Sequence, residues 1–286
     1  MFRIFTFRQL AIISFLLCFI MLSGAALNAV APYVAAFSQS SINVPIIMYH
    51  QIYENSYNCG DYIIPLELLR DDFEYIKENN FHPVSFNELS EYVKTGKKLP
   101  ENPLVITFDD GERSFITKVV PLLEEFSYPA NVNVVGSLVE LYTKNGEIND
   151  RYAYLNENDL KKLSSNPLVE IGCHTYNFHS LNSRRGMTRL KTESDEEYNR
   201  LILDDIRLFQ EKLYNITGKK AVCFAYPFGL RNDTILKILK DEGFTVTLTC
   251  RESTNTLVVG GELYELGRFN RPYGKSSEVF FKSILS

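Results

Sequence analysis

Two adjacent carboxylates stand at the end of an apolar run, where their negative charge needs compensation. The run VITFDDG, residues 105–111, places Asp109 and Asp110 directly after a stretch typical of a buried strand. Burying even one unpaired carboxylate is costly, so a cation is the natural partner. One aspartate could instead cap a following helix, with Gly111 in the turn. A cap uses one carboxylate, and this run has two.

Two of the chain's four histidines end another apolar run. The motif HTYNFH, residues 174–179, follows VEIGC, so His174 leaves a strand end and His179 follows a turn. On a continuous helix, side chains five residues apart point about 140° away from each other, so shared ligation requires this strand and turn. A lone histidine would be a core or surface residue. The pair, together with the two aspartates, indicates metal ligation by one carboxylate and two imidazoles, with the second carboxylate free to act as a base.

Short apolar runs alternate with helical patterns from residue 44 onward, which predicts an α/β fold. Most of the apolar runs carry Val, Ile and Phe without polar alternation, as strands of a parallel sheet covered on both faces do. No G-x-G-x-x-G turn follows an early strand, which argues against a dinucleotide-binding sheet. We therefore expect a barrel of about seven parallel strands. The predicted strands are residues 44–52, 82–86, 104–108, 131–135, 169–174, 221–226, 244–249 and 263–269, and the predicted helices are residues 65–80, 87–95, 114–126, 157–164, 196–214 and 234–241.

A parallel barrel places its chemistry at the carboxyl ends of the strands. The polar residues that interrupt the apolar runs fall at those ends: His50 follows PIIMY, the two aspartates follow LVITF, and His174 follows VEIGC. Pro227 and Gly229 follow VCFAY in the same way. We expect all of them to meet at one mouth of the barrel.

The N-terminal part of the chain has the pattern of an export signal. Two arginines precede a stretch at residues 10–22 that is apolar except for Ser14, and small residues follow. The apolar character continues to residue 37, long enough for an uncleaved membrane span. We expect residues 1–43 to be a signal peptide or an N-terminal membrane anchor with a short linker, and residues 44–286 to be the catalytic domain. Either alternative places that domain outside the cytoplasm, secreted or anchored to the outer face of the cytoplasmic membrane.

Composition excludes several classes of protein. The 286 residues are 45% hydrophobic and 23% charged, which excludes collagen, disordered chains and small disulfide scaffolds. The formal net charge of −5 argues against a nucleic-acid partner. Beyond the N-terminal segment there are four cysteines and no C-x-x-C pair, so we expect small buried side chains and no zinc ribbon.

Three motifs together resemble the polysaccharide deacetylase family, also called the NodB-homology or carbohydrate esterase family 4 domain. They are TFDDG at residues 107–111, HTYNFHSL at residues 174–181 and AYPFG at residues 225–229, and the resemblance covers roughly residues 44–273. It implies a distorted (β/α) barrel and a metal-dependent hydrolase that removes acetyl groups from sugar polymers by cleaving carbon–nitrogen bonds other than peptide bonds. It also implies one divalent metal ion, with Zn²⁺ preferred and Co²⁺, Ni²⁺ or Fe²⁺ as alternatives.

The resemblance implies a role for each matching residue. Asp110, His174 and His179 become the metal ligands, and Asp109 becomes the general base. Phe228, the residue after the proline of the third motif, becomes the donor of a backbone N–H to the oxyanion.

The sequence departs from the usual family pattern in its general acid. The family places a histidine near the C-terminus, yet no histidine follows His179 here. The MYH element at residues 48–50 is similar to one in the circularly permuted branch that includes poly-N-acetylglucosamine deacetylases. The first and last strands of a closed barrel are neighbours, so His50 can supply the acid from the start of the chain. The alternative is that His50 is a buried structural imidazole.

A second departure is that Ala225 replaces the arginine that often opens the third motif and orients the base. Arg268 or Arg271, in the run GRFNRPYG, could replace it, because a charged partner at a strand end would hold Asp109 ionised. Either arginine could equally form a salt bridge on the rim.

The expected substrate is an N-acetylated extracellular polysaccharide, with a poly-N-acetylglucosamine-type glycan first and a cell-wall glycan second. The chain has no Trp, so Tyr or Phe must provide the surfaces that stack on sugar rings. Two other functions stay open at this point. One is a non-catalytic glycan-binding barrel that keeps its metal as a scaffold, and the other is a metal-dependent amidase on a small N-acetylated substrate.

Overall fold

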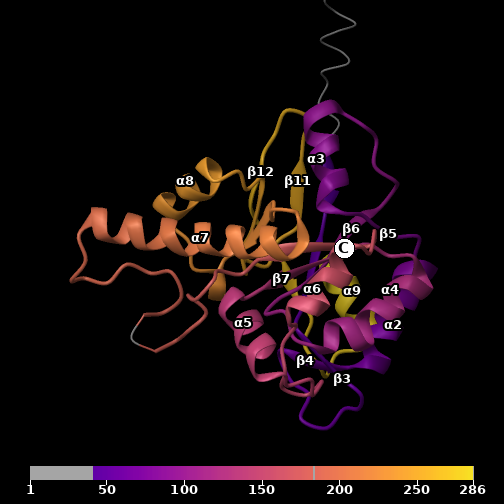
Figure 1. Ribbon diagram of the computed structural model, residues 1–286. Helices are drawn as coiled ribbons and strands as arrows, with labels where there is room; N and C mark the ends of the chain where they lie inside the picture. Colours follow the sequence, from indigo (N-terminus) through magenta and orange to yellow (C-terminus); the bar gives the residue numbers. More distant parts are fainter. Residues whose placement is uncertain (1–40, 183, 286) are drawn as a thin grey trace, which may run out of the picture. The chain divides into compact units, whose positions relative to one another are not determined.

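A parallel sheet forms the centre of the computed structural model, which describes residues 41–182 and 184–285 (Figure 1). Its strands follow the order β12-β10-β9-β8-β7-β6-β2-β13, with β5 beside β6. Every residue of β6 and β7 is buried, as the unbroken apolar runs predict. The bounds are β2 (Ile46–Tyr49), β5 (His82–Pro83), β6 (Pro103–Phe108), β7 (Ala130–Val134), β8 (Val169–Cys173), β9 (Cys223–Ala225), β10 (Val246–Leu248), β12 (Leu263–Leu266) and β13 (Phe269–Asn270).

The last two strands connect the edges of the curled sheet. Strand β12 pairs with β10, and β13, which begins three residues after β12 ends, pairs with β2 on the other edge. The Arg271 N–H donates to the carbonyl of Met48 at 3.0 Å and continues this pairing. The first and last strands are therefore neighbours, and the predicted distorted (β/α) barrel is confirmed.

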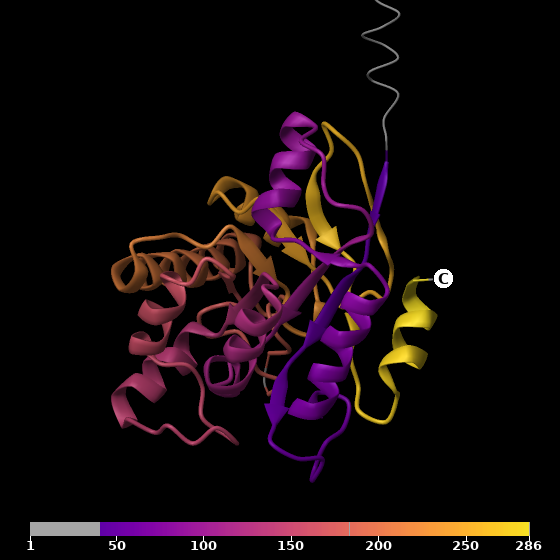
Figure 2. The ribbon, with the colours of Figure 1, turned by 90° about the vertical axis from the view of Figure 1, so that its right-hand side faces the viewer.

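Helices cover the outside of the sheet. Figure 1 shows α2, α4 and α9 on one side and α7 and α8 on the opposite side, and Figure 2 shows α9 beside α2. The longest, α7, begins at a capping box between Ser194 and Glu197 and ends at Gly218, whose φ of 72° suits glycine. The bounds are α2 (Leu66–Glu78), α3 (Phe86–Thr95), α4 (Val120–Phe126), α5 (Gly136–Asn145), α6 (Glu157–Ser164), α7 (Asp195–Thr217), α8 (Asp233–Asp241) and α9 (Ser277–Leu285).

The structure corrects the predicted strand at residues 44–52. The chain changes pairing partners at His50: β2 ends at Tyr49 in the main sheet, and β3 (Gln51–Tyr53) pairs with β4 (Ile63–Pro65) in a separate sheet. Residues 42–44 form a third small sheet, because β1 (Ile42–Val44) pairs with β11 (Asn255–Leu257). His50 is thus placed where a strand of the barrel ends.

Other boundaries also differ from prediction. Helices α5 and α9 were not predicted, and the helix predicted at residues 114–126 begins with a π-helical segment over Phe115–Val119. In the predicted strand 82–86 only His82–Pro83 pairs, because Ser85 caps α3. Helix α5 was not predicted because it begins with glycine, which is a poor helix former.

Cys173 and Cys223 are buried as expected, but Cys59 is partly exposed and Cys250 is exposed. The expectation was wrong for these two because both lie in loops, Cys250 just beyond the end of β10. All four are free thiols. The apolar stretch at residues 10–22 lies outside the described part of the chain, and within that part no helix has the length and apolarity needed to cross a bilayer.

Candidate active site and metal centre

The carboxyl ends of several barrel strands surround one cavity of about 660 Å³. The residues that the sequence singled out come from the ends of β2, β6 and β8 and from the 3₁₀ turn Pro227–Gly229 after β9. The placement of chemistry at the carboxyl ends of the strands is therefore as predicted. Six of the seven candidate residues line this cavity: His50, Asp109, Asp110, His174, His179 and Phe228.

Three of these side chains converge as a metal site would require. The Nε2 atoms of His174 and His179 lie 3.4 and 3.1 Å from Oδ1 of Asp110, and the three ligand atoms lie within 4.8 Å of one another. Oδ1 of Asp110 is buried and accepts no hydrogen bond from the described residues. A buried carboxylate oxygen facing two imidazole nitrogens is the donor set that a divalent transition metal prefers, so the residues fit a metal ion.

The tautomer of His174 also suits ligation. Its Nδ1 lies 2.8 Å from the carbonyl oxygen of Ala225. A carbonyl oxygen can only accept a hydrogen bond, so Nδ1 must carry the hydrogen that is donated. This leaves the lone pair of Nε2 directed toward Asp110. Histidine ligands of metals commonly donate from their second nitrogen in this way.

Arg268 holds Asp109 in a buried ion pair. Nη1 and Nη2 of Arg268 donate to Oδ1 and Oδ2 of Asp109 at 2.8 and 2.7 Å, and both side chains are almost fully buried. Oδ1 also accepts from Nδ2 of Asn133 at 2.8 Å. Of the two arginines considered as orienting groups, Arg268 is the one that contacts Asp109.

Arg271 has a different partner. It forms a bidentate ion pair with Asp72 of α2 at 2.8 and 2.9 Å, and both side chains are fully buried. Tyr49 donates its hydroxyl to the same carboxylate at 3.0 Å. Arg271 therefore links the end of β13 to α2, and its carboxylate partner is Asp72 and not Asp109. Because this pair is buried, it is no rim salt bridge.

Burial would raise the pKa of Asp109, but the Arg268 guanidinium and the nearby imidazoles outweigh it and hold the pKa below its usual value. Burial likewise opposes ionisation of Asp110, and the facing imidazoles of His174 and His179 hold its pKa well below the usual range. Both carboxylates are thus ionised at neutral pH, as a base and a metal ligand require.

His50 stands at the mouth of the cavity where β2 ends. Burial lowers its pKa, and the charges of Asp110 and Asp109 oppose that shift. Its ring contacts Tyr62 edge to face, with ring centroids 4.8 Å apart, and its Nδ1 is buried with no partner among the described residues. The ring is therefore positioned by packing, with a nitrogen that is not engaged by another side chain.

Three non-glycine residues at the strand ends have a left-handed backbone. These are Asp110 and Thr175, both with φ of 70°, and Phe228 with φ of 58°. Such conformations cost energy and concentrate at functional sites. The ring of Phe228 stacks on His179 with centroids 4.9 Å apart, so the third motif packs directly on a candidate ligand.

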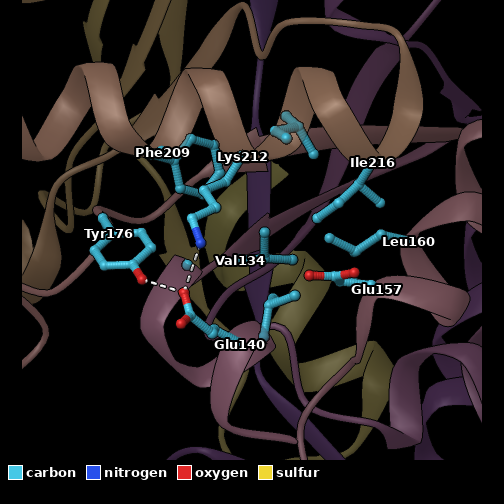
Figure 3. Close-up of a pocket in the computed structure, with 11 residues that line it drawn as sticks. Val134, Glu140, Glu157, Leu160, Tyr176, Phe209, Lys212 and Ile216 are labelled. Carbon is cyan, nitrogen blue, oxygen red and sulfur yellow. Dashed lines mark hydrogen bonds and ion pairs between the residues drawn. The ribbon is translucent and has the colours of Figure 1, made fainter. Parts of the chain in front are cut away.

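The loop between the two histidines is fixed by groups that the sequence analysis missed. Asp205 of α7 accepts hydrogen bonds from the backbone N–H groups of Tyr176 and Asn177 at 2.9 and 2.8 Å. Figure 3 shows the Tyr176 hydroxyl and the Lys212 ammonium both directed at Glu140, beside a small cavity of about 20 Å³. The loop is therefore anchored to both α5 and α7.

Asn133 was also missed, although the sequence held a signal. The run ANVNV alternates asparagine with valine inside a buried strand, and both Asn131 and Asn133 are almost fully buried. A polar side chain at such a position needs a specific partner. That partner is Asp109, which no local pattern could identify.

The sequence profile of the family described as Polysaccharide deacetylase matches residues 96–247, more than half of the chain. The chain belongs to the polysaccharide deacetylase family. The match includes the aspartate pair, both histidines of the second motif and Phe228.

Curated relatives and solved structures of this family are similar to the chain. Poly-beta-1,6-N-acetyl-D-glucosamine N-deacetylase of Escherichia coli K12 is 28% identical in an alignment of 222 residues that covers 71% of this chain and 33% of the relative. The chain thus spans about a third of the length of that relative. The Staphylococcus aureus (strain MSSA476) protein of the same name is 23% identical over 205 residues, 71% of this chain and 67% of its own.

Two solved structures share the fold of this deacetylase-family chain. A de-N-acetylase from Aggregatibacter actinomycetemcomitans has a TM-score of 0.70 at 22% identity, covering 82% of this chain and 97% of the other. IcaB from Ammonifex degensii has a TM-score of 0.67 at 22% identity, covering 81% and 92%.

Proposed function

We propose that the chain is a metal-dependent hydrolase that removes N-acetyl groups from an exported polysaccharide. One observation carries the proposal: an arginine-held carboxylate, Asp109, lines the same cavity as His50 and the cluster Asp110, His174 and His179. A base, an acid and a metal site in one cavity are the parts that amide hydrolysis needs. Membership in the deacetylase family supports the same reaction class.

Asp110, His174 and His179 are the residues that would hold the metal, and we propose Zn²⁺, with Co²⁺, Ni²⁺ or Fe²⁺ as alternatives. Once bound, a divalent ion supplies Lewis-acid chemistry to the acetyl carbonyl and to the attacking water. Two imidazoles and one carboxylate leave coordination positions open, as catalytic sites do.

The chain's own residues divide the proton transfers between them. Asp109 accepts a proton from the water that attacks the acetyl carbon, and His50 donates one to the nitrogen of the leaving amine as the carbon–nitrogen bond breaks. The backbone N–H of Phe228 donates to the oxyanion. The products are acetate and a free amino sugar.

We propose a poly-N-acetylglucosamine-type glycan as substrate, ahead of a cell-wall glycan. The curated relatives that carry the name poly-beta-1,6-N-acetyl-D-glucosamine N-deacetylase support this choice. Tyr62 and Leu181 line the cavity and are 60% and 62% exposed, so apolar side chains suited to sugar rings stand at its mouth. Tyr62 supplies an aromatic stacking surface in this tryptophan-free chain, and Leu181 adds apolar contact beside it.

We also propose that the chain acts outside the cytoplasm, secreted or held by its N-terminal segment at the outer face of the cytoplasmic membrane. The apolar stretch at residues 10–22, preceded by two arginines, supports export. Cell fractionation and N-terminal sequencing of the exported protein distinguish the two arrangements. Recovery of the full-length chain in the cytoplasm would contradict both.

Acetate release tests the proposed reaction. Wild type, Asp109→Asn and His50→Ala are incubated with β-1,6-linked N-acetylglucosamine oligomers, peptidoglycan fragments and monomeric N-acetylglucosamine, and bound metal is measured in each protein. We expect acetate from the β-1,6 oligomers with wild type only and full metal content in all three. Release from the monomer alone would identify a small-molecule amidase, and wild type that holds metal but releases no acetate would identify a binding barrel.

A further inference from the structure

Asp109 accepts hydrogen bonds from two different elements, and only the arginine among these donors was expected. Asn133 lies on β7, the strand paired with β6, whose end carries Asp109. Its side chain is fully buried, and its Nδ2 donates to Oδ1 of Asp109 at 2.8 Å. A neutral amide therefore contacts the candidate base inside the barrel.

The donors are shared unequally between the two carboxylate oxygens. Each oxygen of an ionised carboxylate can accept at two lone-pair positions. Among the described residues, Oδ1 accepts hydrogen bonds from Nη1 of Arg268 and Nδ2 of Asn133, whereas Oδ2 accepts one, from Nη2 of Arg268. Oδ1 is therefore saturated, and Oδ2 keeps one lone pair for a proton.

The surroundings fix the amide of Asn133 in this orientation. Cys223 directs its thiol toward Oδ1 of Asn133, with the sulfur 3.7 Å away, so the amide has a partner at each end. A Cβ added to Gly172 of β8 would lie 2.1 Å from the same oxygen. Glycine at that position is what leaves room for the asparagine.

We propose that Asn133 is a positioning residue that saturates Oδ1 of Asp109 and so directs Oδ2 as the oxygen that accepts the proton from water. This inference rests on the proposed function. Arg268 alone presents a symmetrical fork to the carboxylate and leaves both oxygens equivalent in donor count. Asn133 removes that symmetry.

The test compares Asn133→Leu with Asn131→Leu. Asn131 lies two residues earlier on the same strand and is only 1% exposed, but its Nδ2 donates to the carbonyl of Glu170 at 3.3 Å and not to Asp109. Each substitution removes one buried amide of similar size. Both variants are also made in an Asp109→Asn background, and kcat, KM, bound metal and the urea midpoint of unfolding are measured for all proteins.

We expect Asn133→Leu to lower kcat about 10- to 100-fold while KM and metal content stay near wild type, and we expect a smaller effect from Asn131→Leu. In the Asp109→Asn background, the loss from Asn133→Leu should largely disappear, because a positioning residue has nothing left to position. The urea midpoints of the Asn133 and Asp109 variants should likewise be non-additive.

Each contrary result has a distinct meaning. If Asn133→Leu lowers kcat no more than Asn131→Leu, or lowers it equally with and without Asp109, the amide is only structural and the inference is wrong. Additive urea midpoints would overturn the inference whether or not the protein is active. Absence of acetate release by wild type would instead refute the proposed function.

Discussion

Arg268 and Asp109, 159 residues apart in the chain, form a bidentate ion pair inside the barrel. The pair exists because the segment between β12 and β13 crosses from one edge of the curled sheet to the other and carries Arg268 past the end of β6. We propose that Arg268 takes the place of the arginine that is absent at Ala225 in the third motif. Closure of the barrel is therefore what brings Arg268 to Asp109, the proposed base.

Replacing Arg268 with methionine should destabilise the fold as well as the site. Asp109 would be left as a buried carboxylate without its cation, and breaking a buried pair in this way costs about 3–5 kcal/mol. Urea unfolding at pH 7 measures the loss. The double variant with Asp109→Asn should recover part of it, and a double variant less stable than Arg268→Met would contradict the explanation.

His50→Gln should lower kcat by roughly 10²- to 10⁴-fold, the usual contribution of a general acid. Metal content should not change, because the proposed ligands are Asp110, His174 and His179. His82→Gln is the matched control, since His82 contacts the Glu101 carbonyl at the opposite end of the strands. Loss of metal in His50→Gln would reassign His50 as a ligand.

Metal should stabilise the wild-type protein, and His179→Ala should abolish that gain. An ion held only by the folded state adds about 2.7 kcal/mol at a hundred times its dissociation constant. Thermal unfolding with and without added Zn²⁺, after treatment with a chelator, measures the difference. His82→Ala should keep the full Zn²⁺-dependent increase, and an unchanged increase in His179→Ala would mean that the ion binds elsewhere.

Asp205 should make stability depend on pH. Burial raises the pKa of Asp205 from 3.8 to about 6, although the hydrogen bonds that it accepts from two backbone N–H groups lower the pKa in part. The folded state then binds the proton more tightly than the unfolded state, so this contribution to stability is full below pH 3.8 and is lost as pH rises through about 6. The difference between the pKa values of Asp205 in the unfolded and folded states corresponds to roughly 3 kcal/mol in the free energy of unfolding.

Urea unfolding of wild type and Asp205→Asn at pH 4 and pH 7 isolates the effect of Asp205. The stability of wild type relative to the variant should fall between the two pH values. Glu140→Gln, which alters an exposed group on the same loop anchor, should show no comparable change. A relative stability that rises with pH would show that the two backbone hydrogen bonds outweigh burial.

The sequence by itself determined the fold class and most of the site. Unbroken apolar runs predict strands that are buried on both faces. The polar residue that ends each run marks the carboxyl end of a strand, which is where the active-site residues of a parallel barrel lie. Asp109, Asp110, His174, His179, His50 and Phe228 could therefore be named from the sequence, because each lies within a local motif or at the end of a local pattern.

Only the tertiary structure decided between Arg268 and Arg271. The two lie three residues apart on the same segment, yet Arg268 contacts Asp109 and Arg271 contacts Asp72 of α2. Local sequence cannot make that distinction, because it depends on which way each side chain leaves the strand that closes the barrel. Asn133 and Asp205 escaped prediction for the same reason: their partners Asp109 and Tyr176 lie 24 and 29 residues away and meet them only across neighbouring elements.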